Sequence, residues 1–359
     1  MISQNQIREF SKRYAIDEFT IIREYLQVVF LSALYSMKKS QKIYFKGGTA
    51  IRLLFNAGRF SEDLDFTTNL TIAELNTLIK NVLRKVLFII PDTSLKKVKK
   101  GNKSYSGILS YTPKDAKYPL SLHLEFSIRE IPETSEEHVL QTDFPIPSGA
   151  IIKHLSFTEI LAEKIRALML RSKGRDMYDL WFLLSKGVEL DLKMVNRKMK
   201  FYHIEFSAED ILERIQKFDE KQLKNDLQKF LRVHDRNLIP HLKELILQQM
   251  YSRQEFSIAL SENIAYNKIP MSFSSLTKTK RLPHTFDEAK TFEIQRQDEN
   301  TLMVRVIQNG KKKDKGDILI QALNRNGVRE LGIIEKNSGD LIGIPYAKFI
   351  QKIFRMKFS

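Results

Sequence analysis

Cysteine is absent from this chain of 359 residues, which excludes disulfide bonds, thiolate metal sites and thiol nucleophiles. No apolar run approaches the ~18 residues that a membrane-spanning helix needs. The opening stretch, MISQNQIREFSKRY, is polar and mixed in charge, without the apolar segment of a signal peptide. We therefore expect a cytoplasmic protein with no membrane partner.

Several common site motifs are also missing. Neither GxxxxGK[ST] nor GxGxxG occurs, so the two best-known phosphate-binding loops are not expected. The chain has seven histidines and no His-Glu-x-x-His pattern. A zinc site is not expected from the scattered spacing of His154, His203, His234, His241 and His284.

Acidic residues are outnumbered by basic ones. There are 43 Asp and Glu against 59 Lys and Arg, and the formal net charge is +16. Such an excess favours a polyanionic partner, whether RNA, DNA or an anionic membrane face, and it carries no information about fold.

Hydrophobic periodicity predicts a mixed α and β first part followed by a helical part. Apolar residues at three- and four-residue steps predict helices over 22–37, 49–55 and 71–87. Short apolar runs predict strands at 43–45, 64–66, 104–111 and 120–128. The basic stretch 95–103 is expected to be a hairpin or loop, and nearly everything from Ser156 to about residue 254 favours helix.

The last part of the chain has a different pattern. KTKRLP, residues 278–283, is expected to be a linker, and LMVRVIQ and ILIQAL, separated by a charged turn that begins at Asn309-Gly310, predict a hairpin. We expect three domains: 1–155 with N-terminal helices, 156–277 as a helical domain, and 284–359 as a small β-rich module.

Carboxylates in the strand around residue 64 suggest a metal site. Asp63 and Asp65 are two residues apart, so on a strand they point to the same face. Glu125, in the alternating segment LSLHLEFS, is placed to add a third carboxylate from a neighbouring strand. Such oxygen ligands suit Mg²⁺, which also binds substrate phosphates.

A glycine-rich turn precedes these carboxylates. Gly47, Gly48 and Thr49 follow a predicted strand and open a predicted helix, whose free N–H groups favour phosphate. Arg59 and Ser61 stand just before the carboxylates, where a guanidinium is suited to a triphosphate. The combination predicts a site for a nucleoside triphosphate and a metal ion.

Both of these features belong to a recognisable pattern. KGGTAIRLLF…RFSEDLDF resembles the AbiEii/AbiGii nucleotidyltransferase toxin family of the DNA polymerase β-like superfamily, with Ile51 in place of the usual leucine. TEILAEKIRALMLRSKGRDMYDLWFLL, residues 158–184, resembles the family's second motif, in which Lys164 is expected to contact the nucleotide phosphates. Asp176 and Asp179 match the acidic positions of that motif, and Asp179 is favoured as the catalytic member.

The resemblance implies a fold and an activity. It implies an α+β fold: a polymerase β-like core with a mixed sheet flanked by helices, then a helical region and a small β-rich module. It further implies a toxin of a toxin–antitoxin or phage-defence (abortive infection) system that uses Mg²⁺ or Mn²⁺ to transfer NMP from an NTP. The tRNA 3′ end is the favoured acceptor, and a cognate antitoxin is a possible partner.

Two alternatives remain open from the sequence. The same residues are compatible with nucleotidyl transfer to a protein or a small molecule, or with a non-catalytic RNA- or protein-binding module on a transferase fold. Two lysine clusters are candidate RNA contacts: Lys96, Lys97, Lys99, Lys100 and Lys103, and Lys311, Lys312, Lys313 and Lys315.

Overall fold

The computed structural model describes residues 1–113, 118–146 and 149–253, together with short strands between residues 279 and 335. The chain folds into two compact units, residues 1–206 with 211–249, and residues 207–210 with 250–359. The three-domain division expected from the sequence remains a prediction. Within the described residues, no helix combines the length and the apolar character needed to cross a membrane.

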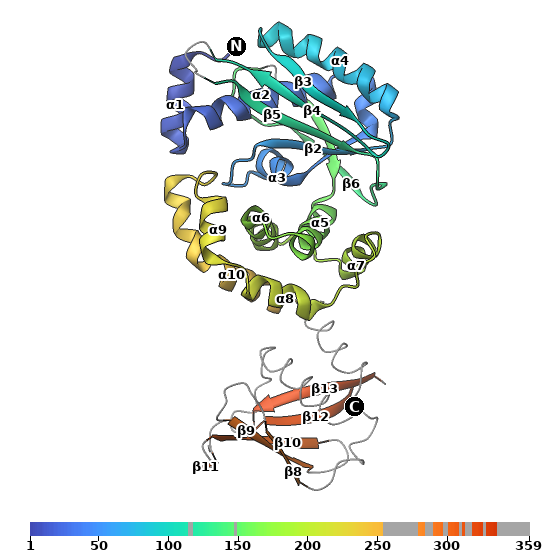
Figure 1. Cartoon of the computed structure of the whole chain (residues 1–359), viewed down its shortest axis with the longest axis vertical. Helices are drawn as coiled ribbons and strands as arrows, with labels where there is room; N and C mark the ends of the chain where they lie inside the picture. Colours follow the sequence, from blue (N-terminus) through green and yellow to red (C-terminus); the bar gives the residue numbers. More distant parts are fainter. Residues whose placement is uncertain are drawn as a thin grey trace. The chain divides into compact units, whose positions relative to one another are not determined.

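A mixed seven-stranded sheet forms the centre of the first unit, in the order β3-β4-β5-β2-β1-β7-β6 (Figure 1). Its strands are β1 (Ile43–Lys46), β2 (Asp63–Thr68), β3 (Ser94–Lys100), β4 (Ser104–Tyr111), β5 (Leu120–Ser127), β6 (Ser135–Val139) and β7 (Ile151–Leu155). β2 runs parallel to β5, and β1 runs parallel to β7, whereas β1 and β2 are antiparallel. The mixed sheet predicted from the sequence is therefore confirmed.

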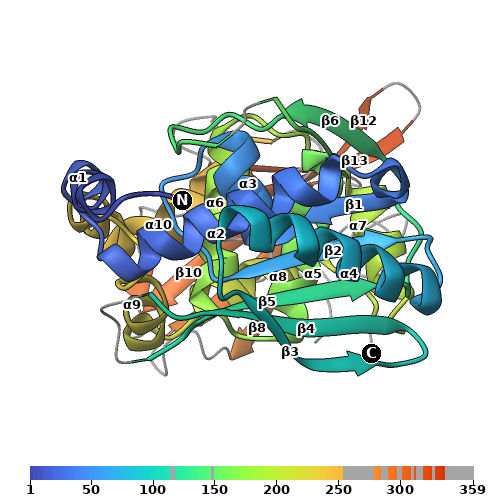
Figure 2. The ribbon, with the colours of Figure 1, turned by 90° about the horizontal axis from the view of Figure 1, so that it is seen from above.

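Two long helices pack side by side on one face of this sheet (Figure 2). They are α2 (Glu18–Tyr35) and α4 (Ile72–Ile89). The helix α1 (Gln4–Tyr14) precedes α2, and a short 3₁₀ helix, η1 (Lys38–Lys42), follows α2 and leads into β1. The core beneath them includes stacked rings of Phe66 and Phe126, whose centroids are 4.5 Å apart. Because side chains alternate along a strand, burying Leu64 and Phe66 on this face turns Asp63 and Asp65 to the other.

The helical part of the first unit lies against the opposite face. α3 (Gly47–Phe55) contacts β1 and β2, and it also packs on α6, which in turn packs on α5 and α9. The helices after the sheet are α5 (Phe157–Leu170), α6 (Gly174–Ser185), α7 (Leu192–Lys200), α8 (Ala208–Gln216), α9 (Glu220–Leu227), the 3₁₀ helix η2 (Val233–His241) and α10 (Leu242–Tyr251). The predicted helical region after Ser156 is confirmed over these elements.

The described strands of the second unit form a separate sheet in the order β13-β12-β10-β9-β8, with β11 paired to β10. They are β8 (Thr279–Pro283), β9 (Lys290–Arg296), β10 (Thr301–Gln308), β11 (Lys311–Lys312), β12 (Ile318–Arg325) and β13 (Val328–Glu335). The predicted pairing of LMVRVIQ with ILIQAL is confirmed by the antiparallel β10–β12 register. Asn309, Gly310, Lys313 and Lys315 lie outside the described residues.

Two local expectations were wrong, and a third was confirmed. Residues 279–283 are not a linker but the edge strand β8, which tolerates Pro283 because an edge position leaves one side of the strand without pairing demands. The basic stretch 95–103 was expected to be a hairpin or loop, and the hairpin is confirmed: most of the stretch is strand β3, which turns at 101–103 and pairs antiparallel with β4. The helix expected to begin near Thr49 begins at Gly47, with Lys46 as its N-cap.

Candidate functional site

The predicted carboxylates meet on one face of the sheet. Asp65 of β2 is directly opposite Glu125 of β5 in the parallel register, and Asp63 is opposite His123. All three carboxylates line one cavity of about 430 Å³. Within the described part of the chain, neither Asp63 nor Asp65 has a side-chain hydrogen bond or ion pair.

Burial and neighbouring negative charge raise the pKa of both aspartates, Asp63 and Asp65. Burial is the largest cause, and it raises the pKa of Asp65 to about 6, with further increases from the like charges of Asp63 and Glu125. Burial also raises the pKa of Asp63. A divalent cation bound among these carboxylates would relieve their mutual repulsion.

The glycine turn brings backbone directly against this carboxylate group. Gly47 has a φ of +79°, which a residue with a side chain rarely adopts, and a Cβ there would overlap the Asp65 carboxylate. A Cβ on Gly48 would overlap the guanidinium of Arg59 and come within 3.3 Å of the Ser61 hydroxyl. The two glycines are therefore required for the close approach of the first turn of α3 to the site.

Thr49 has a structural contact in this turn. It is buried, and its hydroxyl donates a hydrogen bond to the main-chain carbonyl of Asp63, joining α3 to the start of β2. Thr49 does not line the cavity, whereas Gly47, Gly48 and Ser61 do.

The remaining predicted residues form a buried ion-pair network on another wall of the cavity. Arg59, on the loop before β2, is 2% exposed, and its Nε and Nη2 donate to both carboxylate oxygens of Asp179 at 2.8–2.9 Å. Lys164 of α5 lies 2.7 Å from Asp179 and 3.0 Å from Asp176, both on α6. We call Arg59, Lys164, Asp176 and Asp179 the buried ion network.

The network keeps Asp176 and Lys164 ionised. Burial alone would raise the pKa of Asp176, but Lys164 and Arg171 outweigh it and hold that pKa at about 2. Burial would lower the pKa of Lys164, yet Asp179 and Asp176 raise it. Arg59 also donates from Nη1 to the Phe60 carbonyl, so protein groups accept from each nitrogen of its guanidinium, and the phosphate contact expected for Arg59 remains a prediction.

Six further cationic residues line the cavity and were not singled out from the sequence, among them Lys46, Arg171 and Arg175. Lys46 precedes the glycines and is opposite Asp65 in the β1–β2 register, while Arg171 and Arg175 flank the start of α6. The Arg171 side chain is 59% exposed although it pairs with Asp176. The lysine of KGGTA and the basic segment RSKGRD are the signals that would have pointed to them.

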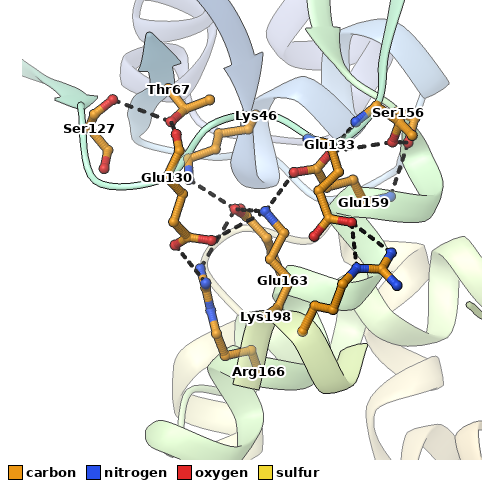
Figure 3. Close-up of polar contacts among 12 residues, drawn as sticks. Lys46, Thr67, Ser127, Glu130, Glu133, Ser156, Glu159, Glu163, Arg166 and Lys198 are labelled. Carbon is orange, nitrogen blue, oxygen red and sulfur yellow. Dashed lines mark hydrogen bonds and ion pairs between the residues drawn. The ribbon is translucent and has the colours of Figure 1, made fainter. Parts of the chain in front are cut away.

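A second polar cluster closes the cavity beyond Lys46 (Figure 3). Glu163 of α5 lies 3.1 Å from the Lys46 ammonium and 3.6 Å from Arg166, and Arg166 lies 2.7 Å from Glu130. Lys198 of α7 lies 2.5 Å from Glu159 and also contacts Glu130.

The same cluster anchors the loop that follows β5. Glu159 accepts hydrogen bonds from the main-chain N–H groups of Glu133 and Thr134 at 3.0 and 2.7 Å. Ser156 caps the same helix by accepting from the Glu159 N–H. These contacts therefore connect the loop after β5 to α5 and α7 at one end of the cavity.

The chain was compared with known proteins. A family model described as "Nucleotidyl transferase AbiEii toxin, Type IV TA system" matches residues 29–258. No curated protein sequence matches significantly.

Solved structures include two similar folds. JHP933 from Helicobacter pylori has 24% identity and a TM-score of 0.41, and the match covers 65% of this chain and 94% of that one. MenT4, a nucleotidyltransferase toxin from Mycobacterium tuberculosis H37Rv, has 16% identity and a TM-score of 0.47, with 71% of this chain and 92% of that one covered.

Proposed function

Because this chain belongs to the nucleotidyl transferase AbiEii toxins of type IV toxin–antitoxin systems, we propose that it transfers a nucleoside monophosphate from an NTP to RNA, with the tRNA 3′ end as acceptor. The family implies a cognate antitoxin. We further propose a cytoplasmic site of action, where NTPs and tRNA occur, and a role in phage defence by abortive infection. The observation that carries the proposal is the group of three carboxylates, Asp63, Asp65 and Glu125, that faces a cationic wall across one cavity.

The residues present fit a magnesium or manganese ion. Asp63, Asp65 and Glu125 offer hard oxygen ligands from neighbouring strands, and burial together with the neighbouring carboxylates raises the pKa of Asp65. A bound Mg²⁺ or Mn²⁺ would supply charge neutralisation for the triphosphate and the developing negative charge.

The chain's own groups would divide the remaining work. The N–H groups at the start of α3, at Gly47 and Gly48, favour a phosphate because that helix end has no side-chain cap. Ser61, lining the same cavity, is a candidate to donate to a phosphate oxygen. Glu125 is a candidate third ligand or general base for the attacking hydroxyl, since it is on the more exposed side of the carboxylate group.

The buried ion network would act mainly by holding its members in place. Asp179 orients Arg59 and Lys164, and Asp176 holds Lys164 toward the cavity. Both cations line the cavity, and a triphosphate there would meet them in fixed positions. The hydroxyl of the acceptor would attack the α-phosphate, and pyrophosphate would leave.

A labelling experiment tests this function. Wild-type protein and the Asp63→Ala variant are incubated with each labelled NTP, Mg²⁺ and total tRNA. Label is expected on RNA with the wild type and one preferred NTP, and none above background with the variant, because one of the carboxylates that would hold the cation is missing.

The same assay separates the alternatives. Parallel incubations contain a protein lysate depleted of RNA, or a panel of small hydroxyl compounds. Label on protein or on a small compound would move the acceptor to that class, whereas the absence of metal-dependent NTP binding would favour a non-catalytic binding module.

Acid is expected to weaken binding of the divalent cation. The pKa of Asp65 is raised to about 6, so below that pH the carboxyl is increasingly protonated and the affinity for Mn²⁺ falls. Titration of Mn²⁺ by electron paramagnetic resonance at pH 7.5 and pH 5.5 is expected to give at least a ~3-fold weaker affinity at the lower pH. An affinity independent of pH over this range would place the cation elsewhere.

RNA binding is expected to involve the lysines of β3 and the turn after it. Lys96, Lys97, Lys99, Lys100 and Lys103 are all exposed. Replacing all five by Gln is expected to weaken tRNA binding and to flatten the slope of log K against log salt by about 3 to 4. Filter binding between low and physiological salt measures both quantities.

A matched variant controls for net charge alone. It replaces five exposed lysines elsewhere in the first unit, Lys80, Lys193, Lys200, Lys221 and Lys224, by Gln. Equal effects of the two variants would mean that β3 is not the RNA contact.

A further inference from the structure

Two histidines and a glutamate form a cluster at the edge of the sheet, outside the cavity described above. Glu136 and His138 are two residues apart on the edge strand β6, so they share a face. His154 is on β7, directly opposite Glu136 in the antiparallel register. The nearest ligand atoms of the three side chains all lie within 4.8 Å of one another, and none of the three residues lines the cavity.

The hydrogen bonds of His154 leave one of its ring nitrogens as a lone-pair donor. Its Nδ1 lies 2.6 Å from the Leu155 carbonyl, which can only accept, so Nδ1 carries the proton. Nε2 is therefore unprotonated, and it faces Nδ1 of His138 at 2.7 Å. A backbone carbonyl that fixes the tautomer of a histidine in this way is the usual support of a metal-ligating imidazole.

The surroundings hold the two imidazoles together. His154 is fully buried, and the Phe157 ring lies 5.1 Å from its ring and 5.6 Å from that of His138. Glu136 is exposed, so the cluster is open to solvent on the carboxylate side.

We propose that Glu136, His138 and His154 bind a divalent transition metal ion, with Zn²⁺ as the favoured ion and water completing the coordination. Two imidazoles and one carboxylate suit Zn²⁺, Ni²⁺ or Co²⁺ rather than Mg²⁺, which prefers oxygen ligands. On binding, the proton on Nδ1 of His138 is lost to solvent or moves to Nε2, and the metal takes its place between the rings.

The required rearrangement is small. Tetrahedral Zn²⁺ with Zn–N bonds of about 2.1 Å holds two nitrogens about 3.4 Å apart, so the two ring nitrogens must separate by roughly 0.7 Å from their hydrogen-bonded distance of 2.7 Å. β6 is an edge strand with a neighbour on one side only, and it can accommodate such a shift. The bound ion would brace β6 against β7, the strand that leads into α5.

The test uses the full chain with Asp63→Ala and Asp65→Ala, which removes carboxylates that would also bind divalent ions. The chelator-treated protein is titrated with Co²⁺, followed by visible absorbance, and then with Zn²⁺ in competition. One equivalent of metal per chain is expected, with a nitrogen-ligated Co²⁺ spectrum. Zn²⁺ at ~100 times its Kd is expected to raise Tm by roughly 5 °C.

Variants locate the ion. The parent chain for these variants is the one with Asp63→Ala and Asp65→Ala. In it, His138→Gln is expected to abolish binding at micromolar Zn²⁺, and Glu136→Gln is expected to weaken Zn²⁺ binding by ~10-fold or more. His241→Gln, at an exposed position on η2, is a matched control that should bind Zn²⁺ as the parent chain does. Absence of bound Zn²⁺ in the parent chain, or unchanged binding in both ligand variants, would overturn the proposal. Neither outcome depends on nucleotidyl transfer.

Discussion

Replacing Asp65 by asparagine is expected to reduce nucleotidyl transfer by ~10³-fold or more, because the amide removes a negative oxygen ligand at the centre of the carboxylate group. Asp65 lies between Asp63, two residues earlier, and Glu125, opposite it on β5. Initial rates of NTP-dependent labelling of tRNA at saturating Mg²⁺ measure the effect.

The same substitution is expected to stabilise the metal-free protein. Burial raises the pKa of Asp65 to about 6, so the folded state binds a proton that the unfolded state, with its ordinary pKa, has already lost. This group therefore contributes stability at low pH that is lost as pH rises from about 4 to about 6. At pH 7.5 we expect Asp65→Asn to increase the free energy of unfolding by roughly 2 kcal/mol.

Urea denaturation in the presence of EDTA measures that change. Asp92→Asn is a matched control, because Asp92 is exposed and outside the cavity, and it should change neither stability nor activity by much. A variant that is both inactive and clearly less stable than wild type would mean that Asp65 has a structural partner rather than a cation to bind.

Replacing Arg59 by alanine is expected to lower the free energy of unfolding by about 3–5 kcal/mol, since it leaves a buried carboxylate short of its bidentate partner. Asp179 is 1% exposed and accepts three hydrogen bonds from Arg59. Lys164, its other cation, is shared with Asp176 and cannot supply the missing contacts. Urea denaturation in EDTA, with the midpoint and slope compared between proteins, gives the difference.

Lysine is not expected to replace this arginine. A single ammonium group cannot make the parallel pair of contacts to Asp179 or reach the Phe60 carbonyl at the same time. Arg13→Ala is the control, since Arg13 pairs with Asp143 on the surface, with side chains 60% and 53% exposed, and should cost less than ~1 kcal/mol. Full stability of Arg59→Lys would show that the bidentate geometry is unimportant.

Local patterns in the sequence were sufficient for the elements that carry the site. Alternation along DLDF, residues 63–66, placed Asp63 and Asp65 on one side of a strand. The adjacent glycines Gly47 and Gly48 indicated a turn into a helix. Such features depend on residues close in sequence, where the strand period of two and the freedom of glycine act directly. The edge strand β8 was not predicted because TKRLP is short and charged. Its strand conformation depends on pairing with β9, a contact that the local pattern does not show.

The sequence alone determined which residues carry charge and which face of a strand or helix they occupy. Only the tertiary structure decided the partners that no local pattern indicates: Asp179 against Arg59 across 120 positions, and His154 against His138 on a neighbouring strand. The physical reason is that ion pairs and shared cavities depend on strand register and helix packing, which long-range burial selects and which local periodicity does not encode.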